Sequence, residues 1–560
     1  MRRPRFWSAA LLMAAAGVVV SAATQSRPPL SDRDIDDIAR LVMLEDTRQF
    51  DEATLSSLTA SSHPEVRRRA IVAVGRIVNP GGGAILAGLR KDPDPVILAT
   101  VVFATGQLKD NDAVAWLSGL LAAPGTPPAV AREAARSLGK IRSPEARAAL
   151  LQFAAAAPAT RDAAPVVGEA LLSLGRFMGR DNIAPIVRWA TSGDVEIRWR
   201  AALALFRLRD PGGVPDLMRL ATDSSPEVRY WAVRGLAPAV VEGATGVTRA
   251  DASALLARAT RDGDRRVRTE ALRALGAYGD DAAFAAVVDA LGSKDTWLSV
   301  SAAESVATFK DRGADFVGPL VIATNRNQSP WLRSAALTPL VALAPEPALD
   351  VAADLAGHSS TVIRAAGRTA LGRLGEAGKV RLSALAAQQP PVTPAPPPAR
   401  ILADYRAIVE RWVVPAYRGA SPPRTIWETP RGTIEIELNP GDVPLGVEYL
   451  VRVVESGDIV GTEFGRVVPN FVAQQQGIRG AARLRDEVNQ LGLLRGTLSW
   501  ASSGLDTGRP GYTLGNTPQP HNEGDFTALG RVVSGMDAVD RLELGDAVAS
   551  ARILKSQSAR

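Results

Sequence analysis

The chain has 560 residues, which is too long for a single hydrophobic core and predicts several structural units. Its 46% hydrophobic and 22% charged residues are typical of a folded protein and exclude a disordered one. The net charge of +6 is spread without a block of like charges, so we expect no nucleic-acid partner. The absence of cysteine excludes disulfides, thiolate metal sites and cysteine nucleophiles.

Residues 1–23 have the pattern of a secretory signal peptide. Three arginines among the first five residues precede an apolar run over residues 9–20, and small residues follow at 21–23. We therefore expect an exported protein, periplasmic or extracellular, with no stable membrane span after signal cleavage. The alternative is an uncleaved N-terminal membrane anchor, because residues 6–23 are barely long enough to cross a bilayer.

Residues 30–385 contain a repeated pattern in which an aliphatic lead residue is followed by a small residue and often a glycine, as in Val66, Ala70 and Gly75. The lead position recurs every 31–39 residues, which predicts about ten helical hairpins stacked into an all-α solenoid. The pattern resembles HEAT repeats of the short, bilin-lyase-like kind. Because such repeats usually bind proteins, we expect a protein partner on the solenoid. The ten lead positions are Val66, Ile97, Val130, Val166, Ile197, Val228, Val267, Leu298, Leu332 and Ile363.

Arginine and tryptophan recur beside the lead positions, and each has two interpretations. The arginines are either structural partners of acids in the hairpins or a basic binding ridge, and the structural role is the one that a repeat demands of its own fold. The tryptophans either pack between hairpins or line a peptide groove. The arginines are Arg67, Arg198, Arg229, Arg268, Arg333 and Arg364; the expected acids include Asp194, Glu196, Glu227 and Asp264; the tryptophans are Trp199, Trp231, Trp297 and Trp331.

Residues 386–424 interrupt the repeats. Six prolines between 386 and 400 cannot form helix or sheet and predict a stiff linker. Residues 401–417 have the periodicity of one amphipathic helix. The following Ser-Pro-Pro-Arg marks a domain boundary near residue 424.

Residues 425–555 change to strand-like alternation. Ile434, Ile436 and Leu438 alternate with polar residues, which predicts a half-buried strand. One helical stretch follows, and then come several short apolar runs. Many short strands with few helices predict a mainly-β, closed barrel.

Five stretches of this region, in order, resemble the cyclophilin-type peptidyl-prolyl isomerases. The resemblance implies an eight-stranded antiparallel barrel with two helices and a shallow groove. It also implies that the partners are proline-containing peptides or unfolded proteins, and that no cofactor or metal is needed. The stretches are GTIEIELNPGDVP (432–444), EFGRVVPNFVAQQQG (463–477), RDEVN (485–489), LRGTLSWASSGLDTG (494–508) and PQPHNEGDFTALGRVVSGMDAVDRL (518–542).

The resemblance assigns the catalytic residues as Arg466, Phe471 and Gln474. Arg466 matches the family's catalytic arginine, Phe471 and Val472 the floor of its proline pocket, and Gln474 the glutamine beside the arginine. Such residues suit the reaction, because rotation about an X-Pro bond needs no nucleophile. It needs a donor to the amide nitrogen as resonance is lost, and a guanidinium is always charged.

The opposite wall departs from the family pattern. Ala501 is retained, but Ser502 replaces an amide side chain, Thr513 an aromatic ring and Gly511 a glutamine. These departures predict weak isomerase activity in the folding of exported proteins. The alternative is a catalytically weakened, cyclophilin-like peptide-binding or scaffold protein. The expected substrate-binding residues are Val472, Ala501, Ser502, Thr513, His521, which matches a common bacterial variant of a groove residue, and Phe526, which replaces a polar ring.

Overall fold

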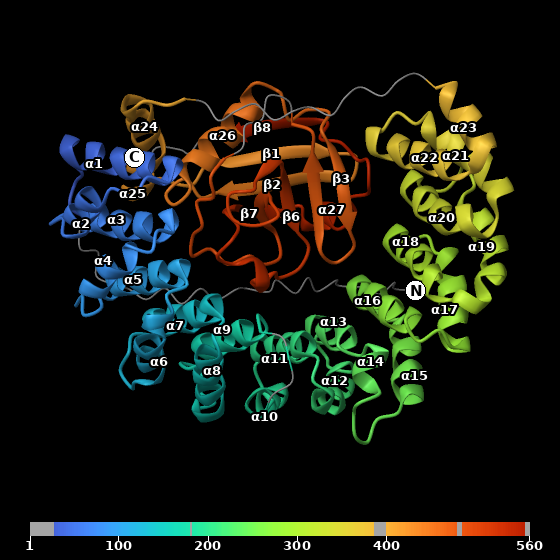
Figure 1. The fold of residues 1–560 in the computed structure, drawn as a ribbon, viewed down its shortest axis with the longest axis horizontal. Coiled ribbons are helices and arrows are strands. Elements are labelled where there is room, and N and C mark those ends of the chain that lie inside the picture. The colour runs from blue at the N-terminus through green and yellow to red at the C-terminus, as the bar shows by residue number, and fades with distance from the viewer. Residues whose placement is uncertain (1–26, 178, 180–181, 386–398, 479–483, 555–560) are drawn as a thin grey trace, which may run out of the picture.

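The computed structural model of the chain describes residues 27–554 except 178, 180–181, 386–398 and 479–483. The expected signal peptide and most of the proline-rich linker lie outside the described residues. Within the described part, no helix is both long and apolar enough to cross a membrane. The described chain consists of a helical solenoid and an eight-stranded sheet domain (Figure 1).

The solenoid is an arc of helical hairpins in two layers, and its inner helices follow one another around the concave side (Figure 1). The inner helices are α1 (Asp32–Thr47), α3 (Pro64–Ile77), α5 (Pro95–Leu108), α7 (Pro128–Ile141), α9 (Ala164–Leu174), α11 (Val195–Leu208), α13 (Pro226–Arg234), α16 (Arg265–Gly276), α18 (Thr296–Ser305), α20 (Pro330–Leu343) and α22 (Thr361–Arg373). The outer helices are α2 (Glu52–Thr59), α4 (Gly82–Gly88), α6 (Val114–Ala122), α8 (Pro144–Ala156), α10 (Ala184–Val187), α12 (Val214–Leu220), α14 (Pro238–Val241), α15 (Arg249–Ala259), α17 (Asp281–Leu291), α19 (Val317–Ala323), α21 (Pro345–Ala356) and α23 (Gly375–Ser383).

The repeated sequence pattern specifies how the inner helices pack. Each of the ten lead residues lies in the first turns of an inner helix, from α3 to α22, and is buried. Several of these helices begin at a proline, whose missing N–H is not needed in the first turn. At Gly75, a Cβ atom would lie 2.7 Å from the Cα atom of Ala104. The repeated glycine therefore lets α3 and α5 approach closely.

Five of the six recurring arginines, all except Arg67, bind acids or turn carbonyls of the solenoid itself, and the four tryptophans are buried. Arg198 Nε donates to Asp223 at 2.8 Å and Arg229 Nε to Asp262 at 2.7 Å, and both also donate to carbonyls in the turn before their own helix. Their partner acids belong to the next hairpin, and not to the set that the sequence suggested. The four tryptophans are all at most 5% exposed, so they pack between helices.

The sheet domain follows the solenoid. Eight antiparallel strands are arranged in the order β3-β4-β6-β5-β7-β2-β1-β8, as the resemblance implied. The sheet curls into a barrel, and residues 545–548, just before β8, hydrogen-bond to the start of β3. The elements are β1 (Arg424–Thr429), β2 (Gly432–Leu438), α26 (Pro444–Glu455), β3 (Glu463–Val468), β4 (Val472–Gln476), β5 (Thr497–Ala501), β6 (Arg509–Gly515), β7 (Ala528–Ser534), α27 (Met536–Val539) and β8 (Ser550–Leu554).

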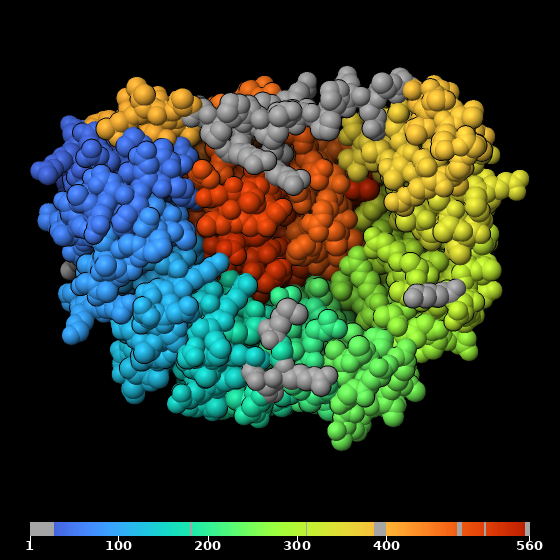
Figure 2. All heavy atoms as spheres, viewed as in Figure 1, coloured from blue at the N-terminus to red at the C-terminus, as the bar shows by residue number. Residues whose placement is uncertain are grey.

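The barrel fills the concave side of the solenoid (Figures 1 and 2). Arginines of the inner helices donate to main-chain carbonyl oxygens of barrel loops. Arg76 reaches Val488 at 2.8 Å, Arg136 reaches Gln490 at 3.0 Å, and Arg273 reaches Pro469 at 2.9 Å. Because the acceptors are main-chain carbonyls, these contacts depend on where the barrel loops run and not on the side chains of those loops. The concave face of the solenoid therefore holds the chain's own barrel.

The helix that precedes the barrel lies beside the first hairpin of the solenoid. It comprises α24 (Leu402–Ile408), a π-helical turn (Val409–Val413) and α25 (Val414–Tyr417). Its apolar face packs against α1, and the Tyr405 hydroxyl donates to Asp46 at 2.8 Å. This helical segment thus joins the start of the barrel to the start of the solenoid.

Candidate active site

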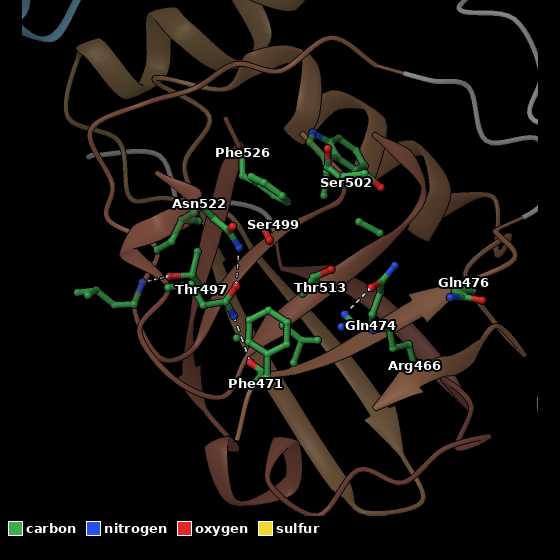
Figure 3. Close-up of a pocket in the computed structure, with 18 residues that line it drawn as sticks. Arg466, Phe471, Gln474, Gln476, Thr497, Ser499, Ser502, Thr513, Asn522 and Phe526 are labelled. Atoms are coloured by element: carbon green, nitrogen blue, oxygen red, sulfur yellow. Dashed lines mark hydrogen bonds between the residues drawn. The ribbon is translucent and has the colours of Figure 1, made fainter. Parts of the chain in front are cut away.

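A cavity of about 450 Å³ opens on the barrel between β3, β4, β5 and β6 and the loops beside them (Figure 3). Eight of the nine residues expected to form the site line this cavity. They are Arg466, Phe471, Val472, Gln474, Ala501, Ser502, Thr513 and Phe526. Strand pairing brings them together, because Gln474 lies opposite Arg466 in β3 and opposite Thr513 in β6.

Arg466 is held in place by two neighbours. It follows an irregularity in the pairing of β3 with β4, and its side chain is exposed. Its Nη1 donates to Gln474 Oε1 at 3.4 Å, and its guanidinium carbon lies 5.4 Å from the ring centroid of Phe471. The cation is therefore directed along the cavity and is not folded back onto the barrel surface (Figure 3).

Phe471 forms one apolar side of the cavity. It lies in the tight turn between β3 and β4, where Asn470 has a positive φ of 59°. Its carbonyl oxygen accepts from the Asn516 N–H at 3.0 Å and from Gln519 Nε2 at 3.1 Å, which fixes the turn. Phe526 lies on the other side of the cavity, so an apolar group can be held between two rings (Figure 3).

The wall formed by β5 and β6 offers the cavity few side chains that could bind a substrate. Thr513 is small, and the Ser502 hydroxyl is already hydrogen-bonded to Gly504 and Thr507 within its own loop. At Gly511, a Cβ atom would lie 2.1 Å from the carbonyl oxygen of Gln475. The backbone therefore leaves no room for a side chain at this position, which accounts for the missing glutamine.

His521 is the one expected site residue that does not line the cavity. It lies in a short 3-10 turn (Pro520–Asn522), stacks on Phe471 with ring centroids 6.3 Å apart, and faces the solenoid. Burial, and then the nearby guanidiniums of Arg207, Arg176 and Arg234, lower its pKa to about 4. The imidazole is therefore neutral at pH 7. The expected role of His521 came from the resemblance of the barrel alone, whereas residues of the solenoid also surround this side chain.

The structure adds residues that the sequence did not single out. Asn522 Nδ2 donates to Gln519 Oε1 at 2.9 Å, and Gln519 in turn supports Phe471. Gln519 and Asn522 lie beside the expected residues, but no spacing in the sequence marks them as neighbours. The other additional lining residues include Gln476, Leu493, Leu494, Thr497, Ser499 and Trp500. Within the described part of the chain, no group of three or more His, Asp or Glu residues is placed to hold a metal ion.

Comparison with known proteins matches both parts of the chain. Residues 425–557 match the family described as cyclophilin type peptidyl-prolyl cis-trans isomerase/CLD, and residues 82–167, 159–237 and 215–308 match HEAT repeats. A peptidyl-prolyl cis-trans isomerase of Synechococcus elongatus is 31% identical over 139 residues, which are 23% of this chain and 96% of that protein. Peptidyl-prolyl cis-trans isomerase B of Bacillus subtilis is 31% identical over 128 residues, 21% of this chain and 90% of that protein. A crystal structure of a cyclophilin from Cryptosporidium parvum covers 24% of this chain and 98% of its own, at 18% identity and a TM-score of 0.22.

Proposed function

Since the chain belongs, through its carboxy-terminal domain, to the cyclophilin-type peptidyl-prolyl cis-trans isomerases, we propose that it assists the folding of exported proteins by isomerising their X-Pro bonds. We place this reaction in the cavity of Arg466 and Phe471. The signal-like pattern of residues 1–23 supports export to the periplasm or the cell exterior. An N-terminally anchored form is the alternative location.

The chemistry requires a twisted amide to be stabilised. Resonance makes the X-Pro bond slow to rotate, with a barrier of about 18–20 kcal/mol. During rotation the prolyl nitrogen regains its lone pair and becomes a hydrogen-bond acceptor. In this proposal Arg466 donates to that nitrogen, Gln474 orients the guanidinium, and the rings of Phe471 and Phe526 hold the pyrrolidine.

The observation that carries the proposal is the placement of Arg466. A guanidinium directed by Gln474 lies on the same cavity as an apolar ring that can receive proline. This is the donor and the binding surface that the reaction needs, and no further cofactor has a role in the proposed step.

A protease-coupled or NMR exchange assay on short X-Pro peptides tests the proposal. We expect Arg466→Ala to lower kcat/KM by about 100-fold, the usual cost of removing one transition-state donor. Arg424→Ala, which changes an exposed barrel arginine outside the cavity, serves as the control and should retain the rate. Equal background rates in all three proteins would contradict the assignment.

The second candidate function is a scaffold that binds proline-containing segments without turning them over. The reduced wall of β5 and β6 favours it, because Gly511 and Ser502 offer no free amide to the substrate. In that case, labelled X-Pro peptides would bind to the wild type while their isomerisation rate stays at background.

A further inference from the structure

A second cavity, of about 280 Å³, lies directly behind the proposed proline site, where the barrel meets the solenoid. Phe471 lines both cavities and is the wall between them. From the barrel come Pro469 and His521. From helices α11, α13 and α16 come two aromatic residues, Phe206 and Trp231, and three arginines, Arg207, Arg234 and Arg273.

The charges around this second cavity do not balance. Arg234 and Arg273 both pair with Glu270, at 3.5 and 3.3 Å, and Arg273 also reaches Glu304, outside the cavity lining, at 3.3 Å. Glu270 also accepts from Asn470 Nδ2 at 3.0 Å. Arg207 has no carboxylate within 4.0 Å among the described residues, and its Nε donates only to the carbonyl oxygen of Gly175, at 3.1 Å. Two carboxylates thus face three guanidiniums, and the positive charge in surplus is that of Arg207.

The titration of the neighbouring groups agrees with that surplus. The pKa of Arg207 is lowered, first by burial and then by the guanidiniums of Arg234 and Arg142. The depressed pKa of His521 has the same origin and keeps its ring neutral. A half-buried cation with like-charged neighbours and no counter-ion favours the arrival of an anion.

We propose that this second cavity is an acidic-residue subsite: it takes the carboxylate of an Asp or Glu near the target proline in the client chain, with Arg207 as the pairing cation. The inference rests on the proposed function, because the bound proline over Phe471 brings the flanking residue to the cavity. A guanidinium pairs strongly with a carboxylate, and the surrounding apolar side chains weaken competition from water.

A third cavity, next to the active site, provides a contrast. It shares Leu494 with the active site and is also lined by solenoid arginines. Its charges balance in number, because the acidic residues that line it are as many as the arginines, and Arg200 pairs with Glu196 at 2.6 Å and Arg136 with Glu169 at 2.9 Å. The arginines are Arg132, Arg136, Arg200 and Arg531, and the acidic residues are Glu169, Asp194, Glu196 and Glu523. We therefore assign the preference for acid to the cavity behind Phe471 alone.

The test uses the full-length chain and matched peptides that contain one X-Pro bond. Asp, Glu, Ala or Lys is placed in turn at each of the three residues before and after the X-Pro pair. At one position or more, we expect the acidic peptide to exceed the lysine peptide in kcat/KM by about 10-fold, as one charge-assisted pair allows. Arg207→Gln should reduce this ratio to less than about 2-fold. Arg200→Gln, on the same helix, should leave it unchanged.

Two further measurements, of salt dependence and of peptide binding, keep the outcomes separate. Raising the salt concentration from about 50 to 500 mM should lower the acid-to-lysine ratio of the wild type, because an open pair is screened. A ratio near one at every position, or one that survives Arg207→Gln, would overturn the subsite while leaving the isomerase intact. If no peptide is turned over, fluorescence anisotropy of the same labelled peptides decides the subsite independently: acid-selective binding that Arg207→Gln abolishes supports it, and equal binding of acidic and lysine peptides overturns it.

Discussion

The guanidinium of Arg466 and the side-chain amide of Gln474 face each other across β3 and β4, with Nη1 3.4 Å from Oε1. In the proposed mechanism this contact orients the donor without neutralising it, because an amide carries no charge. A carboxylate in the same place would compete with the prolyl nitrogen for the guanidinium. The contact therefore predicts distinct effects for changes at the two residues.

Gln474→Leu should lower kcat by about fivefold with little change in KM. The lost hydrogen bond is worth about 1 kcal/mol, and its role is to aim Arg466 rather than to bind the peptide. Steady-state kinetics on one X-Pro peptide separate the two constants. A rise in KM at constant kcat would show instead that Gln474 binds substrate directly.

Glu487 predicts a stability that depends on pH. Its carboxylate is buried and accepts from the N–H groups of Leu445 and Gly446 at 3.2 and 2.7 Å. Burial raises its pKa to about 7 from an ordinary 4.5, so the folded state holds this proton longer than the unfolded state. The stabilisation is complete below about pH 4.5 and is lost as the pH rises through 7.

Glu487→Gln removes this titration. Between pH 4.5 and 8 its free energy of unfolding should rise relative to the wild type by up to about 3 kcal/mol, the value of the shift. Urea denaturation of both proteins at several pH values measures the difference, and other titrating groups cancel in the comparison. A difference that stays constant with pH would mean that Glu487 is ionised throughout.

Arg76 predicts a coupling between solenoid and barrel. Its Nη1 lies 2.7 Å from Glu45, both side chains are at most 7% exposed, and its other nitrogens donate to carbonyls of Val488, Asp442 and Glu487. Arg76→Ala should cost about 3–5 kcal/mol, because it leaves the Glu45 charge buried without a partner.

The double variant Glu45→Leu with Arg76→Met separates the two contributions. It removes both charges, so it should recover the part of the loss that comes from Glu45. The loss that remains measures the contacts to the barrel carbonyls. Denaturation curves of the single and double variants provide both values, and an Arg76→Ala protein as stable as the wild type would refute the coupling.

Two glycines predict opposite effects of the same substitution. A Cβ atom at Gly75 would lie 2.7 Å from the backbone of Ala104, whereas at Gly119, in the exposed part of α6, no atom lies within 4 Å. Gly75→Ala should destabilise the solenoid by about 1–3 kcal/mol. Gly119→Ala should stabilise it by about 0.5–1 kcal/mol, since alanine restricts the unfolded chain. Melting followed by circular dichroism compares the two, and shifts of the same sign would contradict the packing.

The sequence predicted the parts of the fold that local periodicity encodes. The lead positions, such as Val66 and Val267, identify the inner helices because each hairpin must bury an aliphatic residue at the same place. The alternation of Ile434, Ile436 and Leu438 identifies β2, where all three are buried. In the candidate site, a stretch that includes both Arg466 and Gln474 placed these residues correctly on one cavity, because a single hairpin carries them.

The contacts between segments far apart in the chain could not be predicted in the same way. The docking of the barrel depends on arginines such as Arg136 and Arg273, which donate to carbonyls that any residue would offer. Main-chain carbonyls leave no side-chain pattern in the barrel sequence, so the sequence does not predict these contacts. His521 illustrates the consequence, since the arginines around it lie between 287 (Arg234) and 379 (Arg142) residues earlier in the chain. Gly511 is a second case, because its lack of room is a property of the paired backbone.

The contact between α1 and residues 402–417 also orders events during synthesis. On the ribosome, the apolar side of α1 with Ile35, Ile38 and Val42 emerges early, but its covering residues, Tyr405 and Val409, are translated only after the last repeat. The apolar side of α1 therefore stays partly exposed until the whole solenoid has been translated. The newly made chain therefore carries an apolar surface that needs protection from aggregation.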